Sequence, residues 1–238
     1  MPRTNCPLAQ GVRMTRGETI FAWVYYPFYL LLTPLLIQLV FVLAGWTYDI
    51  YTLNLVFFYV NFLAVVIGCR RFLAESLRQT QLLRLVLGML TGYAVNYAGS
   101  LLLAIFSTAL PEYSNPADAN TTSMVLQQGR VMAVCAVLLG PLVEEVLVRG
   151  LIFGPLSRRS RVLAYAVSTL VFSALHLWEF AGSASLPALL LSLLDYVPAS
   201  IALAAAYERG GTIWSPIALH MLLNGMSLWA LSALGGLG

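Results

Sequence analysis

Residues 131–154 have the sequence VMAVCAVLLGPLVEEVLVRGLIFG, an apolar run interrupted by two adjacent glutamates and one arginine. A helix that crosses a hydrocarbon core of roughly 30 Å needs about 20 residues, so this run is long enough to span a membrane. Because ionisable groups are costly inside hydrocarbon, Glu144, Glu145 and Arg149 need a structural or chemical reason to be there. The run therefore predicts a transmembrane helix that carries a functional site.

The rest of the chain is equally apolar. Of the 238 residues, 60% are hydrophobic and only 10% are charged, whereas soluble domains have about 25% charged residues. This composition excludes a soluble domain, a disordered chain, a coiled coil and a disulfide scaffold. We expect an all-α, polytopic bundle of about seven transmembrane helices. The predicted spans lie near residues 20–44, 50–68, 82–109, 131–154, 162–179, 186–206 and 212–234.

Two connecting segments differ from these spans. Residues 69–81, CRRFLAESLRQTQ, are polar and amphipathic, which predicts a short surface helix. Residues 110–129 contain prolines, acids and turn-forming residues, which predict the longest loop. Seven spans leave no room for a second folded unit, so we expect one compact bundle. Within it, residues 1–128 carry no recognised motif, and residues 129–238 carry the candidate chemistry.

The distribution of arginines predicts the orientation in the membrane. All 13 basic residues are arginines, and 11 of them lie before the first span or in and beside the second-to-third, fourth-to-fifth and sixth-to-seventh connections, whereas Arg130 lies on the opposite side and Arg149 inside the fourth span. If every span crosses, these segments lie on one side, and the positive-inside rule places them and the N-terminus in the cytoplasm. The absence of lysine and the abundance of Arg, Ala, Leu and Gly indicate a GC-rich bacterial genome. We therefore expect a multi-pass protein of the bacterial plasma membrane, surrounded by the lipid bilayer.

The sequence also narrows the classes of partner and cofactor. It has no basic cluster of the kind that binds nucleic acid. Cys6, Cys69 and Cys135 are scattered and lack CxxC spacing, which indicates neither a disulfide framework nor a cysteine metal site. Nothing in the pattern indicates the oligomeric state.

The acidic pair in the fourth predicted span has the spacing of a general-base site. Glu145 and Arg149 are four residues apart, so they share a helix face and can pair. Glu144 is rotated by about 100° and is left without that partner, which leaves one carboxylate free to titrate. Pro141 should loosen the helix just before the pair. The alternative interpretation is a structural ion pair with a spare acid.

Both histidines of the chain fall inside predicted spans. His176 follows Phe172 by four residues, and Asn224 follows His220 by four residues, so each pair shares one helix face. At 1.5 Å per residue, Glu144 and His176 lie about 21 Å from the same side, and His220 and Asn224 about 14–20 Å from it. If their helices are neighbours, these residues meet near the midplane. Asp195, in the sixth span, is interpreted as a polar packing or cavity residue.

A carboxylate, two imidazoles and an amide in a low-dielectric cavity can perform hydrolysis. The carboxylate can take a proton from water, one histidine can share that task, and histidine and asparagine can stabilise an oxyanion. Two histidines and one glutamate are also a catalytic zinc set, in which Glu144, His176 and His220 would be the ligands. Residue spacing leaves both mechanisms open.

The motifs EExxxR (Glu144, Glu145, Arg149), FxxxH (Phe172, His176) and HxxxN (His220, Asn224) resemble those of a known family. This family comprises the CAAX-protease and bacteriocin-processing (CPBP, or Abi) intramembrane proteases, which include bacterial proteins similar to type II CAAX prenyl endopeptidases. The stretch YERGGTIWSPIALHMLLN, residues 207–224, is similar to the family's approach to its last motif. The resemblance covers about residues 129–228.

The resemblance implies a membrane bundle with a cavity among the motif helices, and hydrolysis of a peptide bond in a membrane-associated or lipidated protein or peptide. It implies that Glu144 is the base, that His176 helps to bind the water, and that His220 and Asn224 form the oxyanion site. Glu145 and Arg149 would orient the others. A metal-free, glutamate-type mechanism is favoured, so no cofactor is expected, with divalent zinc as the alternative.

One departure from the family bears on the substrate. Eukaryotic CAAX-processing members often have HxxxN in the second motif, whereas residue 180 here is Phe, and Phe172 precedes His176 instead. That pattern resembles bacterial relatives and does not indicate a prenylated substrate.

Other membrane-protease chemistries fit poorly. The chain lacks HExxH and GxGD, and Ser183 and Ser185 lie in a connection. The main alternative function is a non-catalytic immunity or partner-binding protein that retains the fold. A small transporter would need a continuous polar pathway, whereas the polar residues converge at one depth.

Overall fold

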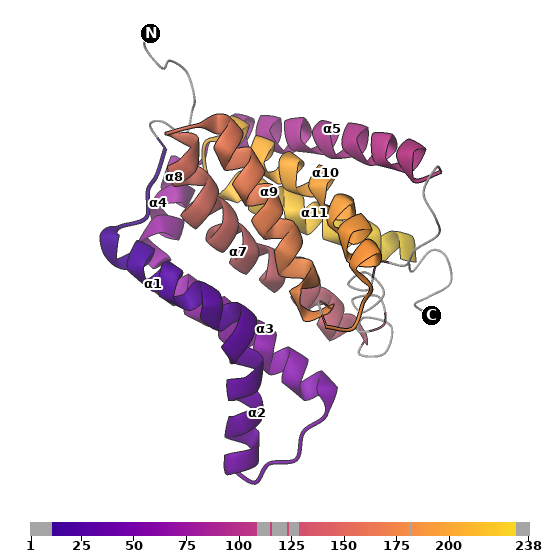
Figure 1. Cartoon of the computed structure of the whole chain (residues 1–238). Helices are drawn as coiled ribbons and strands as arrows, with labels where there is room; N and C mark the ends of the chain where they lie inside the picture. The colour runs from indigo at the N-terminus through magenta and orange to yellow at the C-terminus, as the bar shows by residue number, and fades with distance from the viewer. Residues whose placement is uncertain (1–10, 109–114, 116–122, 124–128, 181, 232–238) are drawn as a thin grey trace.

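The computed structural model describes residues 11–108, 115, 123, 129–180 and 182–231, and this part of the chain is helical, with no strand (Figure 1). The predicted all-α class is therefore confirmed. The predicted loop over residues 110–129 lies outside the described residues except at positions 115, 123 and 129. The helical elements are α1 (Arg16–Pro27), η2 (Phe28–Leu32), α2 (Thr33–Leu43), α3 (Ile50–Gly68), α4 (Arg70–Gln79), α5 (Leu82–Ser107), η3 (Cys135–Leu139), α7 (Gly140–Glu145), η4 (Val146–Phe153), α8 (Gly154–Ser157), α9 (Arg161–Leu177), η5 (Trp178–Phe180), α10 (Leu186–Gly210) and α11 (Trp214–Leu231).

Four helices in the described part of the chain are long and apolar enough to cross a membrane. They are α3, α5, the continuous helix Gly129–Ser157 that includes η3, α7, η4 and α8, and α10. The shorter apolar helices α2 and α9, together with α11, coincide with the remaining predicted spans. The chain is thus an integral membrane protein, while the count of seven crossings and the cytoplasmic N-terminus stay predictions.

The first predicted span, residues 20–44, is not one regular helix. α1 ends at Pro27, the π-helical η2 follows, and α2 has a proline, Pro34, in its first turn. Proline has no N–H and its ring crowds the preceding turn, so these two prolines interrupt the α-helical ladder. Thr33 Oγ1 donates a hydrogen bond of 2.9 Å to the Phe28 carbonyl. Beyond this point α2 turns away from the bundle, together with the first part of α3 (Figure 1).

α4 is the surface helix predicted over residues 69–81, and it is bound to the start of α1. Its apolar face buries Phe72 and Leu73, while its arginines are exposed. Glu18, only 6% exposed, accepts hydrogen bonds from the backbone N–H of Thr15 at 2.9 Å and of Phe72 at 2.8 Å. One carboxylate therefore caps α1 and also satisfies an N–H in the first turn of α4.

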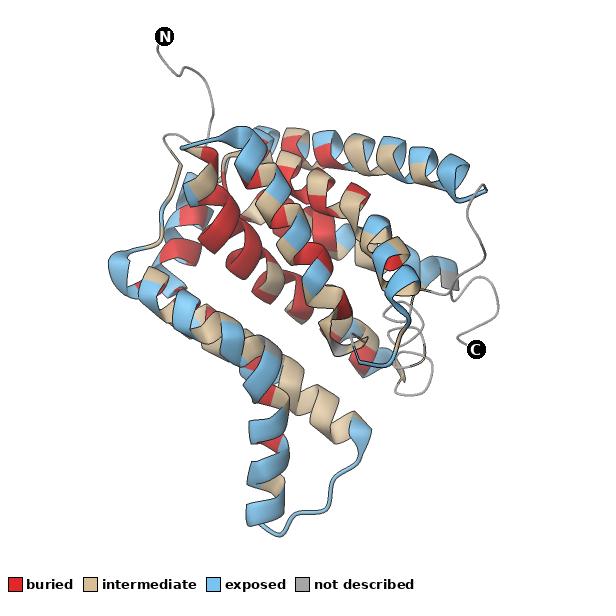
Figure 2. Ribbon diagram, in the orientation of Figure 1, coloured by how far each residue is buried: buried red, intermediate tan, exposed pale blue. Residues whose placement is uncertain are grey.

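Among the four candidate spans, the helix Gly129–Ser157 is the most deeply buried (Figure 2). Every residue of η4 is buried, whereas many large apolar side chains of α2, α3 and α5 are exposed. Exposed apolar faces on outer helices suit contact with lipid. α5 packs closely on α10, since a Cβ added at Gly92 would lie 2.6 Å from the Ala202 carbonyl oxygen. Small residues allow such close approach in membrane bundles.

Candidate active site

The helix that carries Glu144, Glu145 and Arg149 changes its winding around them. The π-helical segment η3 comes first. It is followed by the six-residue α7, which begins with Gly140 and Pro141, and then by the π-helical segment η4. Because Pro141 has no N–H, the carbonyl one turn earlier lacks its normal helical donor. The loosening predicted at this proline is therefore present as a π-helical turn, a feature that often occurs at functional sites.

Glu145 and Arg149 form a fully buried ion pair. Arg149 Nη1 lies 3.1 Å from Glu145 Oε1, and both side chains are 0% exposed. Arg149 Nη2 donates to the backbone oxygen of Ser200 at 2.9 Å and to Ser200 Oγ at 3.0 Å. The guanidinium is thus held from α10 as well as from its own helix, which compensates for the burial of its charge.

Phe172 lies at the centre of the polar residues. The Arg149 guanidinium carbon is 4.5 Å from the centroid of the Phe172 ring. The same ring lies 4.7 Å from the His176 ring and 5.7 Å from the His220 ring. The phenylalanine of the FxxxH motif therefore packs against the buried cation and against both imidazoles.

Each imidazole is oriented by a hydrogen bond at Nδ1. His176 Nδ1 lies 2.9 Å from the Phe172 carbonyl oxygen, and His220 Nδ1 lies 2.9 Å from Glu145 Oε1. Since both oxygens accept only, each bond assigns a proton to Nδ1 and leaves Nε2 for the site. Both Nε2 atoms face Glu144 Oε2, at 3.8 Å from His176 and 3.9 Å from His220.

Glu144 has no equivalent of the ion pair that its neighbour makes. Its Oε2 atom is buried and has no hydrogen-bond partner among the described residues. The side chain is 18% exposed, whereas that of Glu145 is 0% exposed. The two adjacent carboxylates therefore have the different environments expected from their positions on the helix.

Asn224 is placed differently from the other predicted site residues. It lies one turn after His220 on α11, but its Nδ2 donates to the Ala136 carbonyl of η3 at 3.1 Å. No hydrogen bond joins it to Glu144 or either histidine in the described structure. The fold thus brings Glu144, Glu145, Arg149, His176 and His220 into one cluster and places Asn224 beside it.

Two residues at the site had not been predicted, and both lie on α10. The Tyr196 ring stacks on that of His176, with centroids 4.5 Å apart and planes at 27°, and Ser200 binds Arg149. The guanidinium of Arg149 has five N–H donors, so the sequence indicates that a buried Arg149 needs acceptors besides Glu145. The sequence does not indicate which helix supplies them. Asp195, predicted as a polar packing or cavity residue, accepts a hydrogen bond from Asn115 Nδ2 at 2.9 Å.

The site residues only partly suit zinc. Glu144, His176 and His220 have the right chemistry, because Nδ1 of each histidine is bound to an acceptor and Nε2 remains for a ligand. Tetrahedral ligands of zinc lie about 3.3 Å apart, however, and the two separations here are 3.8 and 3.9 Å. Within the described residues, no group of three or more His, Cys, Asp or Glu could hold a metal ion. Zinc binding would therefore require Glu144 and the two histidines to move closer together than they lie here.

The fold and the site define a class of protein, namely polytopic α-helical membrane proteins with a buried carboxylate–imidazole cluster. Residues 126–226 match the family model of type II CAAX prenyl endopeptidase Rce1-like proteins. The resemblance predicted from the three motifs is thereby confirmed over this part of the chain.

A curated relative supports the same class. It is "Putative membrane peptidase YdiL" of Bacillus subtilis (strain 168), and the two sequences are 30% identical over 101 residues. The aligned segment is 42% of this chain and 37% of the relative, so it spans just over a third of the relative's length. No solved structure gives a significant match.

Proposed function

We propose that this protein is an endopeptidase of the bacterial plasma membrane that cleaves a membrane-associated or lipidated protein or peptide with water activated by Glu144. The observation that carries the proposal is Glu144 Oε2, which is buried, unpartnered in the described structure and faced by both Nε2 atoms. A buried carboxylate oxygen is costly unless something binds it. The Rce1-like match over residues 126–226 supports the peptidase class.

The spacing in the cluster suits a bridging water. The separations of 3.8 and 3.9 Å exceed a direct hydrogen bond. A water about 2.8 Å from the carboxylate oxygen and from one Nε2 spans such a gap. Glu144 and His176 would then hold the nucleophile from two sides, as the family resemblance implies for these residues.

The hydrolysis balances with the groups present. The water oxygen forms a bond to the scissile carbonyl carbon, and the water proton passes to Glu144. The tetrahedral intermediate collapses with cleavage of the C–N bond, and Glu144 returns the proton to the leaving nitrogen. The products are a carboxylic acid and an amine, and the acid then loses its remaining proton to the amine or to solvent.

The oxyanion would be stabilised from α11. Asn224 donates one amide hydrogen to Ala136, which leaves a second for the developing negative charge. The bond from His220 Nδ1 to Glu145 orients that ring so that Nε2 faces the site. Glu145, Arg149 and Ser200 act as positioning residues, since they orient His220 and enclose the site.

The test compares peptide termini in native membranes that contain wild-type protein, Glu144→Gln or the matched control Glu75→Gln at equal abundance. Glu75 is an exposed glutamate on α4 and is not part of the cluster around Glu144. We expect termini that appear with the wild type and with Glu75→Gln and disappear with Glu144→Gln, and these termini identify the substrate.

The same comparison separates the proposal from the non-catalytic alternative. If no terminus depends on Glu144 and a cellular phenotype survives Glu144→Gln, the protein is a binding or immunity protein on this fold. The peptidase assignment would then be wrong.

A further inference from the structure

A small pocket lies where the segment that leads into α1 meets α8 and the last turns of α10. Arg13 lines it from that segment, Gly154 and Arg158 from α8 and the turn after it, and Tyr207 from α10. We call it the arginine pocket. Its volume is about 170 Å³, below the roughly 300–1,000 Å³ of sites for drug-sized ligands. The arginine pocket therefore suits a small chemical group.

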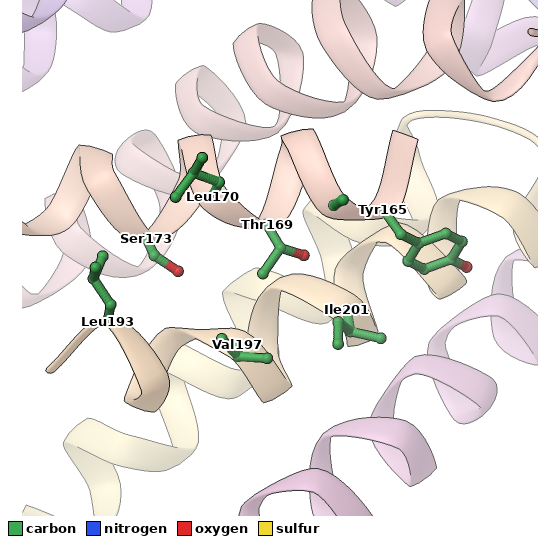
Figure 3. Close-up of a pocket in the computed structure, with 8 residues that line it drawn as sticks. Tyr165, Thr169, Leu170, Ser173, Leu193, Val197 and Ile201 are labelled. Carbon is green, nitrogen blue, oxygen red and sulfur yellow. The ribbon is translucent and has the colours of Figure 1, made fainter. Parts of the chain in front are cut away.

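The arginine pocket differs from the larger groove between α9 and α10. That groove has a volume of about 300 Å³ and an apolar lining that includes Leu170, Leu193 and Val197 (Figure 3). The hydroxyl oxygens of Thr169 and Ser173 in its α9 wall are buried and present no surface to it. The groove thus offers little polar surface, whereas the arginine pocket has charged and hydroxyl groups in its walls.

The arginine pocket is positively charged. Arg13 and Arg158 line it, and no acidic side chain is among the described residues that do so. The neighbouring acids are bonded elsewhere, since Glu18 accepts backbone hydrogen bonds at the starts of α1 and α4, and Glu208 binds Arg161 at 2.6 Å. The carbonyl end of α8 contributes about half a negative charge, which two guanidinium groups outweigh. The pocket therefore favours an anion.

Tyr207 adds a neutral hydrogen-bond donor. Its side chain is 3% exposed, and no hydrogen bond joins its hydroxyl to another described residue. The hydroxyl lies beside a residue without a side chain, because a Cβ added at Gly154 would be 3.4 Å from Tyr207 Oη. Unlike the enclosed hydroxyls of Thr169 and Ser173, it lies at the surface of a pocket. A buried tyrosine hydroxyl usually has a partner, and an anion in the pocket would supply one.

The residue types in the pocket match a phosphate group. Guanidinium groups bind phosphate oxygens with paired, charge-assisted hydrogen bonds. A tyrosine hydroxyl can donate to a further oxygen. Arg13, Arg158 and Tyr207 together therefore provide donors from three separate segments of the chain.

The pocket lies at the level of lipid headgroups. Arg158 comes directly after the candidate span Gly129–Ser157, and Tyr207 lies three residues before the end of α10. Headgroups lie just outside the roughly 30 Å hydrocarbon core. Most of the arginines of the chain are on this side of the bundle by the sequence analysis, and basic pockets between transmembrane helices bind anionic headgroups.

We propose that the arginine pocket binds the phosphate group of an anionic phospholipid, with Arg13 and Arg158 paired to its oxygens and Tyr207 donating its hydroxyl. The apolar lining, which includes Met14 and Leu151, then contacts the glycerol and the first carbons of the acyl chains.

This site is separate from the catalytic cluster. Gly154 follows Glu144 by ten residues of one continuous helix, which is about 15 Å along its axis. The bound lipid is therefore not the substrate of the proposed peptidase, and the inference does not depend on peptidase activity.

The experiment measures lipid binding to delipidated, full-length protein in detergent. Dioctanoyl phosphatidylglycerol is titrated, and the melting temperature is recorded, since a ligand that binds only the folded protein raises it. We expect a saturable rise for the wild type. Tyr207→Phe, which removes one hydroxyl and no charge, should weaken the apparent affinity about tenfold. Arg13→Gln/Arg158→Gln should weaken it at least as much.

Matched controls remove the same groups elsewhere. Tyr97→Phe changes an exposed tyrosine of α5, and Arg70→Gln/Arg71→Gln removes two exposed arginines of α4. Both variants, and Glu144→Gln, should bind the lipid like the wild type. Because the Tyr207 hydroxyl has no described partner, lipid-free Tyr207→Phe should melt like the lipid-free wild type, which distinguishes lost binding from misfolding.

Two results with the variants overturn the inference. One is equal affinity of Tyr207→Phe and the wild type for phosphatidylglycerol. The other is an equal loss of affinity in Arg70→Gln/Arg71→Gln and Arg13→Gln/Arg158→Gln, which would indicate attraction to the arginine-rich surface as a whole.

Other ligands test the source of the phosphate. Inorganic phosphate and glycerol 3-phosphate carry the anionic group without acyl chains, and saturation by either at the phosphatidylglycerol concentration would assign the pocket to a soluble phosphate. Phosphatidylcholine adds a cation beside the two arginines, so it should bind at least tenfold more weakly. Equal affinity for phosphatidylcholine would also overturn the assignment to an anionic lipid.

Discussion

Glu144 Oε2 and His176 Nε2 face each other at 3.8 Å across the interior of the bundle, from α7 and α9. The distance is too long for a hydrogen bond and suits a shared water. Adjacent Glu145 makes direct bonds instead, to Arg149 at 3.1 Å and to His220 at 2.9 Å. The two neighbouring carboxylates thus have different roles: Glu145 binds Arg149 and His220, and Glu144 faces the Nε2 atoms of both histidines.

Removal of the buried cation should destabilise the protein. Arg149→Met leaves Glu145 without its guanidinium partner at 0% exposure, with only the His220 imidazole bound to it. The loss of one partner of a buried pair costs about 3–5 kcal/mol in free energy of unfolding. Thermal unfolding in detergent measures the change. Glu145→Gln/Arg149→Met, which removes both charges, should recover a large part of the loss. A single variant as stable as the wild type would contradict the structural role given to this pair.

Loss of the ring that stacks on His176 should slow catalysis. Tyr196→Ala removes a ring 4.5 Å from that of His176, and such a contact contributes enough to change a rate about two- to tenfold. We expect kcat on the identified substrate to fall within this range. Tyr97→Ala, which removes an exposed tyrosine from α5, is the control and should leave kcat unchanged. Equal kcat values for Tyr196→Ala and Tyr97→Ala would show that Tyr196 does not contribute to catalysis.

A methyl group between α5 and α10 should weaken the bundle. Gly92→Ala would place a Cβ 2.6 Å from the Ala202 carbonyl oxygen, so the helices must separate; overpacking of this kind costs about 1–3 kcal/mol. Gly17→Ala, which meets nothing within 4 Å in the first turn of α1, is the matched control and should be neutral or slightly stabilising. Thermal unfolding of the two variants compares them directly, and equal melting temperatures would refute the close packing.

Cleavage should not require a metal ion. The separations of 3.8 and 3.9 Å between Glu144 and the histidines are wider than zinc ligation. We expect purified protein to keep its rate after dialysis against EDTA and 1,10-phenanthroline. Loss of activity that stoichiometric zinc restores would contradict this prediction and show a metal-dependent peptidase, for which Glu144, His176 and His220 are the candidate ligands.

Much of this arrangement follows from sequence patterns, because those patterns are local. Apolar runs give the helices, and four-residue spacing gives the pairing of Glu145 with Arg149. The polar character of residues 69–81 gives the amphipathic α4. In each case the interacting residues lie on one helix, where geometry is fixed by the 3.6-residue repeat.

What was missed depends on contacts between helices. Ser200 and Tyr196 are ordinary residues of an apolar helix, and only the packing of α10 against the motif helices places them at Arg149 and His176. The bond from Asn224 to Ala136 likewise requires the position of η3 relative to α11. The bend over residues 27–34 depends on two prolines whose joint effect on a span was not anticipated, although proline is a known interruption.

The most direct test of the mechanism is the rate at which purified, reconstituted Glu144→Gln protein cleaves the identified substrate. Glutamine keeps the size of the side chain but cannot accept the water proton, and general-base catalysis contributes roughly 10²- to 10⁴-fold. We predict a fall in kcat of that size with an unchanged melting temperature and an unchanged KM. A Glu144→Gln enzyme with wild-type kcat would contradict the assignment of Glu144 as the base.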